Sequence, residues 1–175
     1  MGLPPARTPG TYRVAVVCLG NICRSPIAHV VLEKHVADAG LGERVSVISA
    51  GTADWHQGKP MDGRAAATLT SNGYDPTRHR ARQIPPSWLA ECDLVLAMDA
   101  DNLADLRAMG SSTEQHERVR LFRDFDPGAS PRDRFVPDPY YGGPEGFELV
   151  LDMVVRTSEQ LVTLLTDALR DVRRD

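Results

Sequence analysis

Short runs of β-branched residues alternate with helical segments along most of the chain, and this alternation restricts the fold more than any other feature. The run 14–17 contains no polar residue, which is typical of a strand buried on both faces. The expected strands are 14–17, 44–49, 93–97 and 119–122, and the expected helices are 26–39, 62–72, 101–109 and a long amphipathic one over 147–169. We therefore predict an α/β fold: a three-layer sandwich whose central four-stranded parallel sheet is flanked by helices, as in flavodoxin-like proteins.

The length and charge of the chain limit its organisation and partners. Its 175 residues suit one domain, and no repeat or shift in composition marks a second. Residues 1–11 contain proline and glycine without an apolar stretch, so we expect a flexible N-terminal tail followed by a single domain over 12–175. The net charge of −4 argues against nucleic-acid binding, which needs a basic face.

Hydropathy and cysteine content bear on location. No apolar run approaches the roughly 18 residues needed to span a bilayer, so we expect no membrane partner. The three cysteines are an odd number and form no disulfide framework. Together these features predict a cytoplasmic protein with reduced thiols.

The segment VCLGNICRSP leads from the first expected strand directly into a helix. In open parallel sheets, ligands bind beyond the carboxyl ends of the strands. A loop that closes on a helix N-terminus points several backbone N–H groups at one place, and the helix dipole adds about half a positive charge. We therefore predict an anion-binding loop made of Leu19, Gly20, Asn21, Ile22, Cys23 and Ser25, with Gly20 and Asn21 tolerating the unusual dihedrals it requires.

The residues at the two ends of this loop predict nucleophilic chemistry at phosphorus. Positive potential stabilises a thiolate, so Cys18 should ionise readily. Arg24 can hold two phosphate oxygens with its planar guanidinium. We expect Ser25 to donate a hydrogen bond to the sulfur while capping the helix, with Pro26 at the first helical position. Because protein groups supply the positive charge, this chemistry requires no metal and no cofactor.

A long segment without clear periodicity, RDFDPGASPRDRFVPDPYYGGPEG, precedes the last helix, and loops of this length are often functional. A leaving oxygen needs a proton, and one carboxyl group can supply it and later activate water. The segment offers Asp124, Asp126, Asp133 and Asp138. Local sequence slightly favours Asp138, since Pro137 and Pro139 restrict its backbone, but leaves the others open.

The longer motif CLGNICRSPIA resembles the signature of the low-molecular-weight protein tyrosine phosphatases. The resemblance continues through SAGTADWH, HRARQI, CDLVLAMD and DPYYG and covers nearly the whole chain after Tyr12. It implies a phosphotyrosine phosphatase I-like fold. It also implies that phosphotyrosine-containing proteins are hydrolysed through a phosphocysteine on Cys18, with inorganic phosphate as product.

The same resemblance assigns further roles. Asp138 falls in the family's acid motif and is implied as general acid and then general base. Trp55, Tyr140 and Tyr141 are implied to bind the substrate, with Trp55 and Tyr140 as walls of a slot for its aromatic ring. Asn21, Ser49 and His79 resemble the hydrogen-bond network that supports the anion loop.

The remaining two cysteines differ in their expected roles. The resemblance implies that Cys23 can trap Cys18 in a reversible disulfide, although a passive loop thiol is an open alternative. Cys92 begins an apolar strand and is expected to be structural. Cys18 and Cys23 have no second pair that would complete a zinc site.

Particular residues argue against other functions of proteins with a similar fold or anion loop. Thioredoxin-coupled arsenate reductases need a further cysteine where this chain has Asp99, and protein-arginine phosphatases have threonine where it has Ile22. A phosphopeptide-binding module would need neither Cys18 nor Asp138, and a flavin phosphate loop is normally rich in hydroxyl groups. We expect a monomer or weak self-association, which the exposed Tyr140 and Tyr141 could support.

Overall fold

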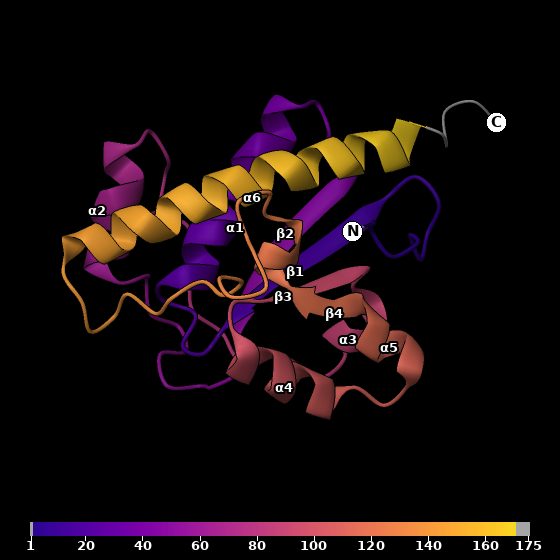
Figure 1. Ribbon diagram of the computed structural model, residues 1–175, viewed down its shortest axis with the longest axis horizontal. Helices are drawn as coiled ribbons and strands as arrows, with labels where there is room; N and C mark the ends of the chain where they lie inside the picture. Colours follow the sequence, from indigo (N-terminus) through magenta and orange to yellow (C-terminus); the bar gives the residue numbers. More distant parts are fainter. Residues whose placement is uncertain (1, 171–175) are drawn as a thin grey trace.

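The computed structural model describes residues 2–170, which form a parallel sheet between two layers of helices (Figure 1). The strands are β1 (Tyr12–Cys18), β2 (Val45–Gly51), β3 (Leu94–Ala97) and β4 (Val119–Leu121), in the order β2-β1-β3-β4. The helices are α1 (Arg24–Asp38), α2 (Gly63–Ser71), α3 (Trp88–Glu91), α4 (Ala100–Met109), α5 (Thr113–Arg118) and α6 (Pro144–Arg170), with a 3₁₀ turn, η1 (Phe122–Phe125). The predicted three-layer α/β fold is confirmed.

The alternation of side chains along β1 explains the two helical layers. Val14 and Val16 belong to a core formed with α1, α2 and α6. Ala15 and Val17 point to the other face and pack in a second core with α3 and α4. Because all four side chains are fully buried, residues 14–17 of the strand have no polar face. Figure 1 shows α1, α2 and α6 on one side of the sheet and α3, α4 and α5 on the other.

Helix α6 covers one face of the sheet with the apolar stripe predicted from its spacing. Its buried apolar residues are Phe147, Val150, Leu151, Met153, Val154, Leu161, Leu165 and Leu169. None of the helices in the part of the chain described here is long and apolar enough to cross a membrane.

The short elements differ from the prediction. Helices α3 and α5 span only four and six residues and were not predicted. Strand β2 extends to Gly51, past the expected end at residue 49, because Ala50 and Gly51 pair in register with Val17 and Cys18. Helix α1 begins at Arg24, two residues before the predicted start.

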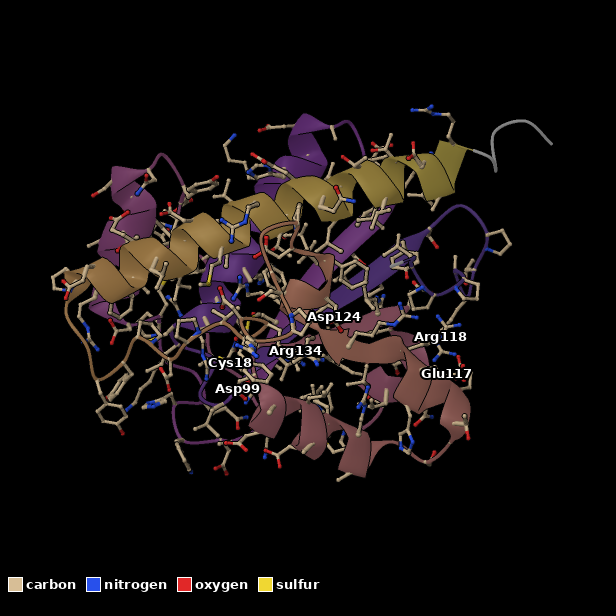
Figure 2. All side chains as sticks on the ribbon, in the orientation of Figure 1. Cys18, Asp99, Glu117, Arg118, Asp124 and Arg134 are labelled. Carbon is tan, nitrogen blue, oxygen red and sulfur yellow. The ribbon has the colours of Figure 1, made fainter. Side chains whose placement is uncertain are left out.

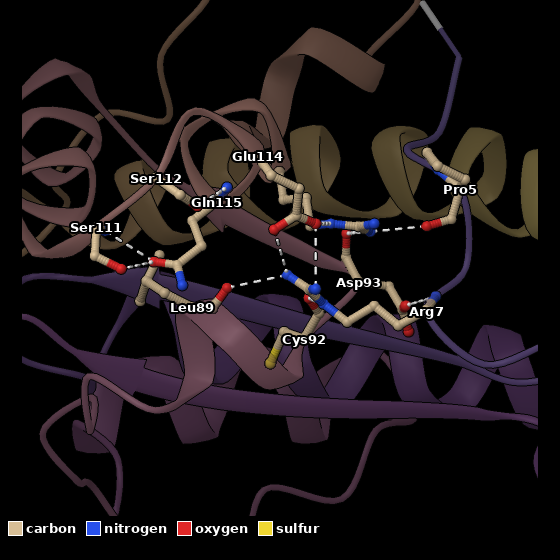
Figure 3. Close-up of polar contacts among 10 residues, drawn as sticks. Pro5, Arg7, Leu89, Cys92, Asp93, Ser111, Ser112, Glu114 and Gln115 are labelled. Carbon is tan, nitrogen blue, oxygen red and sulfur yellow. Dashed lines mark hydrogen bonds and ion pairs between the residues drawn. The ribbon is translucent and has the colours of Figure 1, made fainter.

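The N-terminal segment, for which we expected a flexible tail, instead lies against the amino end of β3 (Figure 3). The backbone N–H of Arg7 donates to the Asp93 carboxylate at 2.6 Å, and the Arg7 guanidinium pairs with Glu114 at 3.1 Å. Arg118 donates to the carbonyls of Pro5 and Asp93 at 2.8 and 3.0 Å. These bonds attach the segment at the end of the sheet opposite Cys18.

Candidate active site

Cys18 is the last residue of β1, so the loop that follows it lies at the carboxyl end of the central strand (Figure 2). The loop closes after five residues, where Arg24 begins α1. Both Cys18 and Arg24 are buried. The structure thus brings the predicted anion loop to the edge of the sheet where parallel folds bind ligands.

Asn21 holds the loop in its turned conformation. Its φ of 57° is the only positive value among the non-glycine residues described, and its side chain is fully buried. The left-handed conformation costs a non-glycine residue roughly 1–2 kcal/mol. The Asn21 side-chain amide donates to Ser25 Oγ at 2.8 Å and to Ser49 Oγ at 3.3 Å, while its carbonyl oxygens accept from Arg82 N at 3.0 Å and His79 Nε2 at 2.8 Å. These bonds offset the strain and place the predicted supporting residues Asn21, Ser49 and His79 in one network.

The hydroxyl of Ser25 points toward the sulfur of Cys18 and does not cap the helix to which Ser25 belongs. Its Oγ lies 3.0 Å from Cys18 Sγ, and the backbone N–H of Asn21 donates to the same sulfur at 3.3 Å. The expectation that Ser25 also caps α1 is wrong, because the helix starts earlier, with Cys23 at the N-cap and no side-chain cap. The hydroxyl is therefore available to hydrogen-bond a thiolate.

Arg24 is fixed over the loop by two partners. Its Nη1 donates to Asp99 Oδ2 at 2.6 Å and to the carbonyl of Val136 at 3.0 Å. Its Nη2 lies 3.8 Å from Asp138 Oδ2. Burial opposes the charge of Arg24, but the neighbouring Cys18, Asp99 and Asp138 outweigh it, so the pKa of Arg24 is raised. Among residues 2–170 no hydrogen bond to a protein group uses Nε or Nη2, which leaves these donors for an anion.

A cavity of about 220 Å³ opens above Cys18. Loop residues form its floor, and an aromatic rim surrounds it. The lining residues are Cys18, Leu19, Gly20, Ile22, Cys23, Arg24, Trp55, His56, Asp138, Tyr140 and Tyr141. The rim is open to solvent: Trp55 is 65% exposed, Tyr140 39% and Tyr141 92%. All three residues predicted to bind the substrate therefore lie around the cavity.

The four aspartates of the long loop differ in their position relative to the cavity. Only Asp138 lines the cavity, and its side chain is 42% exposed. Asp126 and Asp133 pair with Arg123, and Asp124 accepts a hydrogen bond from Leu121 N. The structure thus places only one of the four beside Cys18 and Arg24.

The other two cysteines are buried thiols. Burial, followed by the negative charges of Asp62, Cys18 and Asp138, raises the pKa of Cys23 to about 12. Burial raises the pKa of Cys92 to about 12 as well, and Cys92 lies outside the cavity. Within residues 2–170 no three metal-ligating side chains are grouped closely enough to hold an ion.

The sequence indicated no site role for Asp99 or Gly51, and for His56, next to Trp55, it favoured a solvated loop position over contact with the substrate. Asp99 anchors Arg24, and a Cβ on Gly51 would lie 2.5 Å from the Leu19 carbonyl oxygen, so the loop needs glycine there. His56 lines the cavity beside Gly20. The local signals were a carboxylate two residues after the end of β3 and a glycine at the end of β2.

Known proteins match this chain over most of its length. The family model for low molecular weight phosphotyrosine protein phosphatase matches residues 13–172. A low molecular weight protein-tyrosine-phosphatase of Streptomyces coelicolor is 46% identical over 157 residues, covering 90% of this chain and 95% of the relative. A protein tyrosine phosphatase from Entamoeba histolytica, solved with Hepes in its active site, is similar with a TM-score of 0.83 and 33% identity, covering 90% of this chain and 98% of that one. The structure of YfkJ from Bacillus subtilis has a TM-score of 0.83 and 31% identity, covering 93% and 98%.

Proposed function

The chain belongs to the low molecular weight phosphotyrosine protein phosphatase family, and we propose that it hydrolyses protein phosphotyrosine through a phosphocysteine intermediate on Cys18. The observation that carries this assignment is the placement of Cys18 Sγ. The sulfur lies at the floor of the cavity, within hydrogen-bond reach of Ser25 Oγ and Asn21 N, and Arg24 lies over the loop.

In the first step, Cys18 Sγ attacks phosphorus, the S–P bond forms and the bond from phosphorus to the tyrosyl oxygen breaks. The loop N–H groups and the free Nε and Nη2 donors of Arg24 stabilise the equatorial oxygens, which carry the developing charge. Asp138, near the mouth of the cavity, donates the proton that the leaving oxygen requires.

In the second step, Asp138 accepts a proton from water as the water oxygen bonds to phosphorus. The S–P bond breaks, the electron pair returns to Cys18 and inorganic phosphate is released. The hydroxyl of Ser25, 3.0 Å from the sulfur, stabilises the thiolate that leaves.

Depth and the aromatic rim favour tyrosine over serine. The thiol of Cys18 is buried at the floor, whereas Trp55 and Tyr140 stand at the mouth. A phosphotyrosine ring can span this depth and stack between the two rings, which contributes about 0.5–1.5 kcal/mol beyond burial. A phosphoserine side chain is too short to do both.

Two finer assignments also belong to this proposal. Cys18, Cys23 and Cys92 are free thiols, which supports a reducing compartment such as the cytoplasm. Tyr141 is almost wholly exposed beside the cavity, where it can contact a protein substrate or a second copy in weak self-association.

Hydrolysis of para-nitrophenyl phosphate and of a phosphotyrosine peptide in EDTA tests the proposal. Wild-type protein should be active, and Cys18→Ser should lower kcat at least about 10³-fold, because the serine hydroxyl stays protonated and is a far weaker nucleophile than the thiolate. Cys92→Ala is the matched control, since that thiol lies outside the cavity, and it should keep wild-type kcat. An inactive, fully reduced wild-type protein, or a fully active Cys18→Ser variant, would overturn the assignment.

A further inference from the structure

His29 connects the molecular surface to the anion loop from the far side of α1. Its Nδ1 lies 3.2 Å from Ser49 Oγ, and its Nε2 lies 3.3 Å from Glu33 Oε2. The side chain is 26% exposed and lines a groove of about 550 Å³ that is separate from the cavity above Cys18. The imidazole therefore meets solvent on one side and the network around Asn21 on the other.

An unbroken sequence of contacts leads from this imidazole to the sulfur. Ser49 Oγ lies 3.3 Å from Asn21 Nδ2, the same amide nitrogen donates to Ser25 Oγ at 2.8 Å, and Ser25 Oγ lies 3.0 Å from Cys18 Sγ. Apart from His29, every member is buried. Each contact must therefore be satisfied within the protein.

Counting donors fixes the direction of these bonds when His29 is neutral. The two amide hydrogens of Asn21 go to Ser25 and Ser49, so the Ser49 hydroxyl accepts from Asn21 and is free to donate to His29 Nδ1. The Nε2–H of His29 then donates to Glu33. Bonds aligned in this way polarise one another, which makes Ser49 a better acceptor for Asn21.

Protonation of His29 reverses one bond. Both ring nitrogens then donate, so Ser49 Oγ must accept from His29 and from Asn21 at once, and the Ser49 hydrogen loses its acceptor. Asn21 is then held less firmly. Since Asn21 carries the strained backbone of the loop, the placement of Cys18 and of the N–H groups depends on this bond.

The charges around His29 come from two elements. On α1, Glu33 accepts from His29 and also pairs with Arg78, which lies in the segment before α3. The pKa of Glu33 is lowered, first by the hydrogen bond from His29 and also by Arg78, so Glu33 stays ionised at neutral pH. Burial lowers the pKa of His79, and His29 adds to that effect, which favours the neutral form of the ring that donates to the Asn21 carbonyl. The charged residues Lys34, Asp38 and Asp75 line the same groove.

We propose that His29 is a positioning residue for the phosphatase reaction, whose neutral form aligns the Ser49–Asn21–Ser25 hydrogen bonds onto Cys18 and whose protonation weakens them. The inference rests on the proposed function. It adds that the protonation of a partly exposed side chain controls the geometry of the same site.

Two amide substitutions test the roles of the two ring nitrogens separately. The amide of His29→Asn can stand near Nδ1 and accept from Ser49 at every pH, whereas the longer His29→Gln replaces Nε2 and loses the Ser49 contact. We expect the kcat ratio of wild type to His29→Asn to rise about threefold to tenfold between pH 5 and 8, an effect the size of one hydrogen bond. Groups common to both proteins, Asp138 included, cancel in this ratio. The His29→Gln variant should have lower kcat throughout, with KM little changed.

The route through Ser49 provides a second test. In a Ser49→Ala background, replacing His29 with Asn should no longer change the pH profile, because the connecting hydroxyl is absent. The alkylation rate of Cys18 by iodoacetate, measured across the same pH range, reports the sulfur without turnover. A flat wild-type to His29→Asn ratio in an active enzyme overturns this inference alone, whereas absence of turnover overturns the proposed function and leaves alkylation to decide the role of His29.

Discussion

The two loops that form the site are built in opposite ways. Residues 19–23 lie between β1 and α1, and the buried Asn21 at their centre makes hydrogen bonds with four neighbouring segments. Residues 126–143 are long and open, and Asp138 accepts a hydrogen bond only from Tyr140 N among the residues described. The first loop holds the nucleophile and the anion donors, and the second carries the acid and part of the aromatic rim.

This difference corresponds to two chemical requirements. Donors to a transition state must be aligned before the reaction, because reorganisation during the reaction would cost much of their effect. An acid that first donates and then accepts a proton must admit two different partners, a tyrosyl oxygen and water. We therefore expect changes in the short loop to affect both stability and activity, and changes at Asp138 to affect activity alone.

The largest expected effect follows from Asp138→Asn. With a phosphotyrosine peptide, kcat should fall roughly 10²- to 10⁴-fold, because the leaving oxygen receives no proton. The loss should be smaller with para-nitrophenyl phosphate, whose leaving group is a weaker base, and the melting temperature should stay within about 2 °C. Asp133→Asn in the same loop is the control, since Asp133 pairs with Arg123 outside the cavity. Equal kcat losses in the two variants would contradict the assignment.

Gly51→Ala should damage the short loop without touching a reacting group. The added methyl would lie 2.5 Å from the Leu19 carbonyl oxygen and 3.1 Å from Asn21 N, so the backbone must move. We expect kcat/KM to fall roughly 10²-fold, as small misplacements near a reacting centre do, and the free energy of unfolding to fall by about 1–3 kcal/mol. Gly142→Ala in the long loop has its nearest contact at 3.8 Å and should change neither quantity. Wild-type kinetics in Gly51→Ala would show that the loop is less tightly fixed than its contacts indicate.

Acid should weaken the attachment of the long loop at Asp126, by lowering the charge of its carboxylate. Burial opposes ionisation of Asp126, but hydrogen bonds from Arg156 and Arg123 outweigh it and lower the pKa of Asp126 to about 2. Because this pKa lies below the ordinary value of 3.8, the carboxylate stabilises the fold above pH 4, and this contribution is lost as pH falls toward 2. Urea unfolding should show a loss on the order of 2 kcal/mol over that interval.

Asp126→Asn should lack this part of the pH dependence, whereas the exposed Asp152→Asn should retain it. If the stability of Asp126→Asn fell by the same amount as that of the wild type between pH 4 and pH 2, the anchor would not depend on this carboxylate.

The parts predicted from sequence were those with a local pattern. The strands, the long helix α6 and the segment from Cys18 to Ser25 each show their periodicity or motif within one stretch of chain. Helices α3 and α5 are too short to display a helical period. The start of α1 was misplaced because Ser25, a strong capping residue, is recruited by Cys18 Sγ instead.

The parts that escaped prediction depend on distant contacts. Asp99 matters because it holds Arg24, 75 residues earlier, and nothing near Asp99 in the sequence indicates that partner. Gly51 is required by the carbonyl of Leu19, on the neighbouring strand's loop. In the sequence His29 is an ordinary helix residue, and only the structure shows its contact with Ser49.

The central position of β1 affects how late during synthesis the active site can form. The strand that bears the nucleophile is made first, yet its two neighbours in the sheet are β2 and β3. The bond from Arg82 N to Asn21 spans 61 residues, and that from Arg24 to the Val136 carbonyl spans 112. Such long closures form late in folding. A nascent chain therefore exposes Cys18 as an ordinary thiol, and its reactivity toward phosphate arises only after most of the protein has left the ribosome.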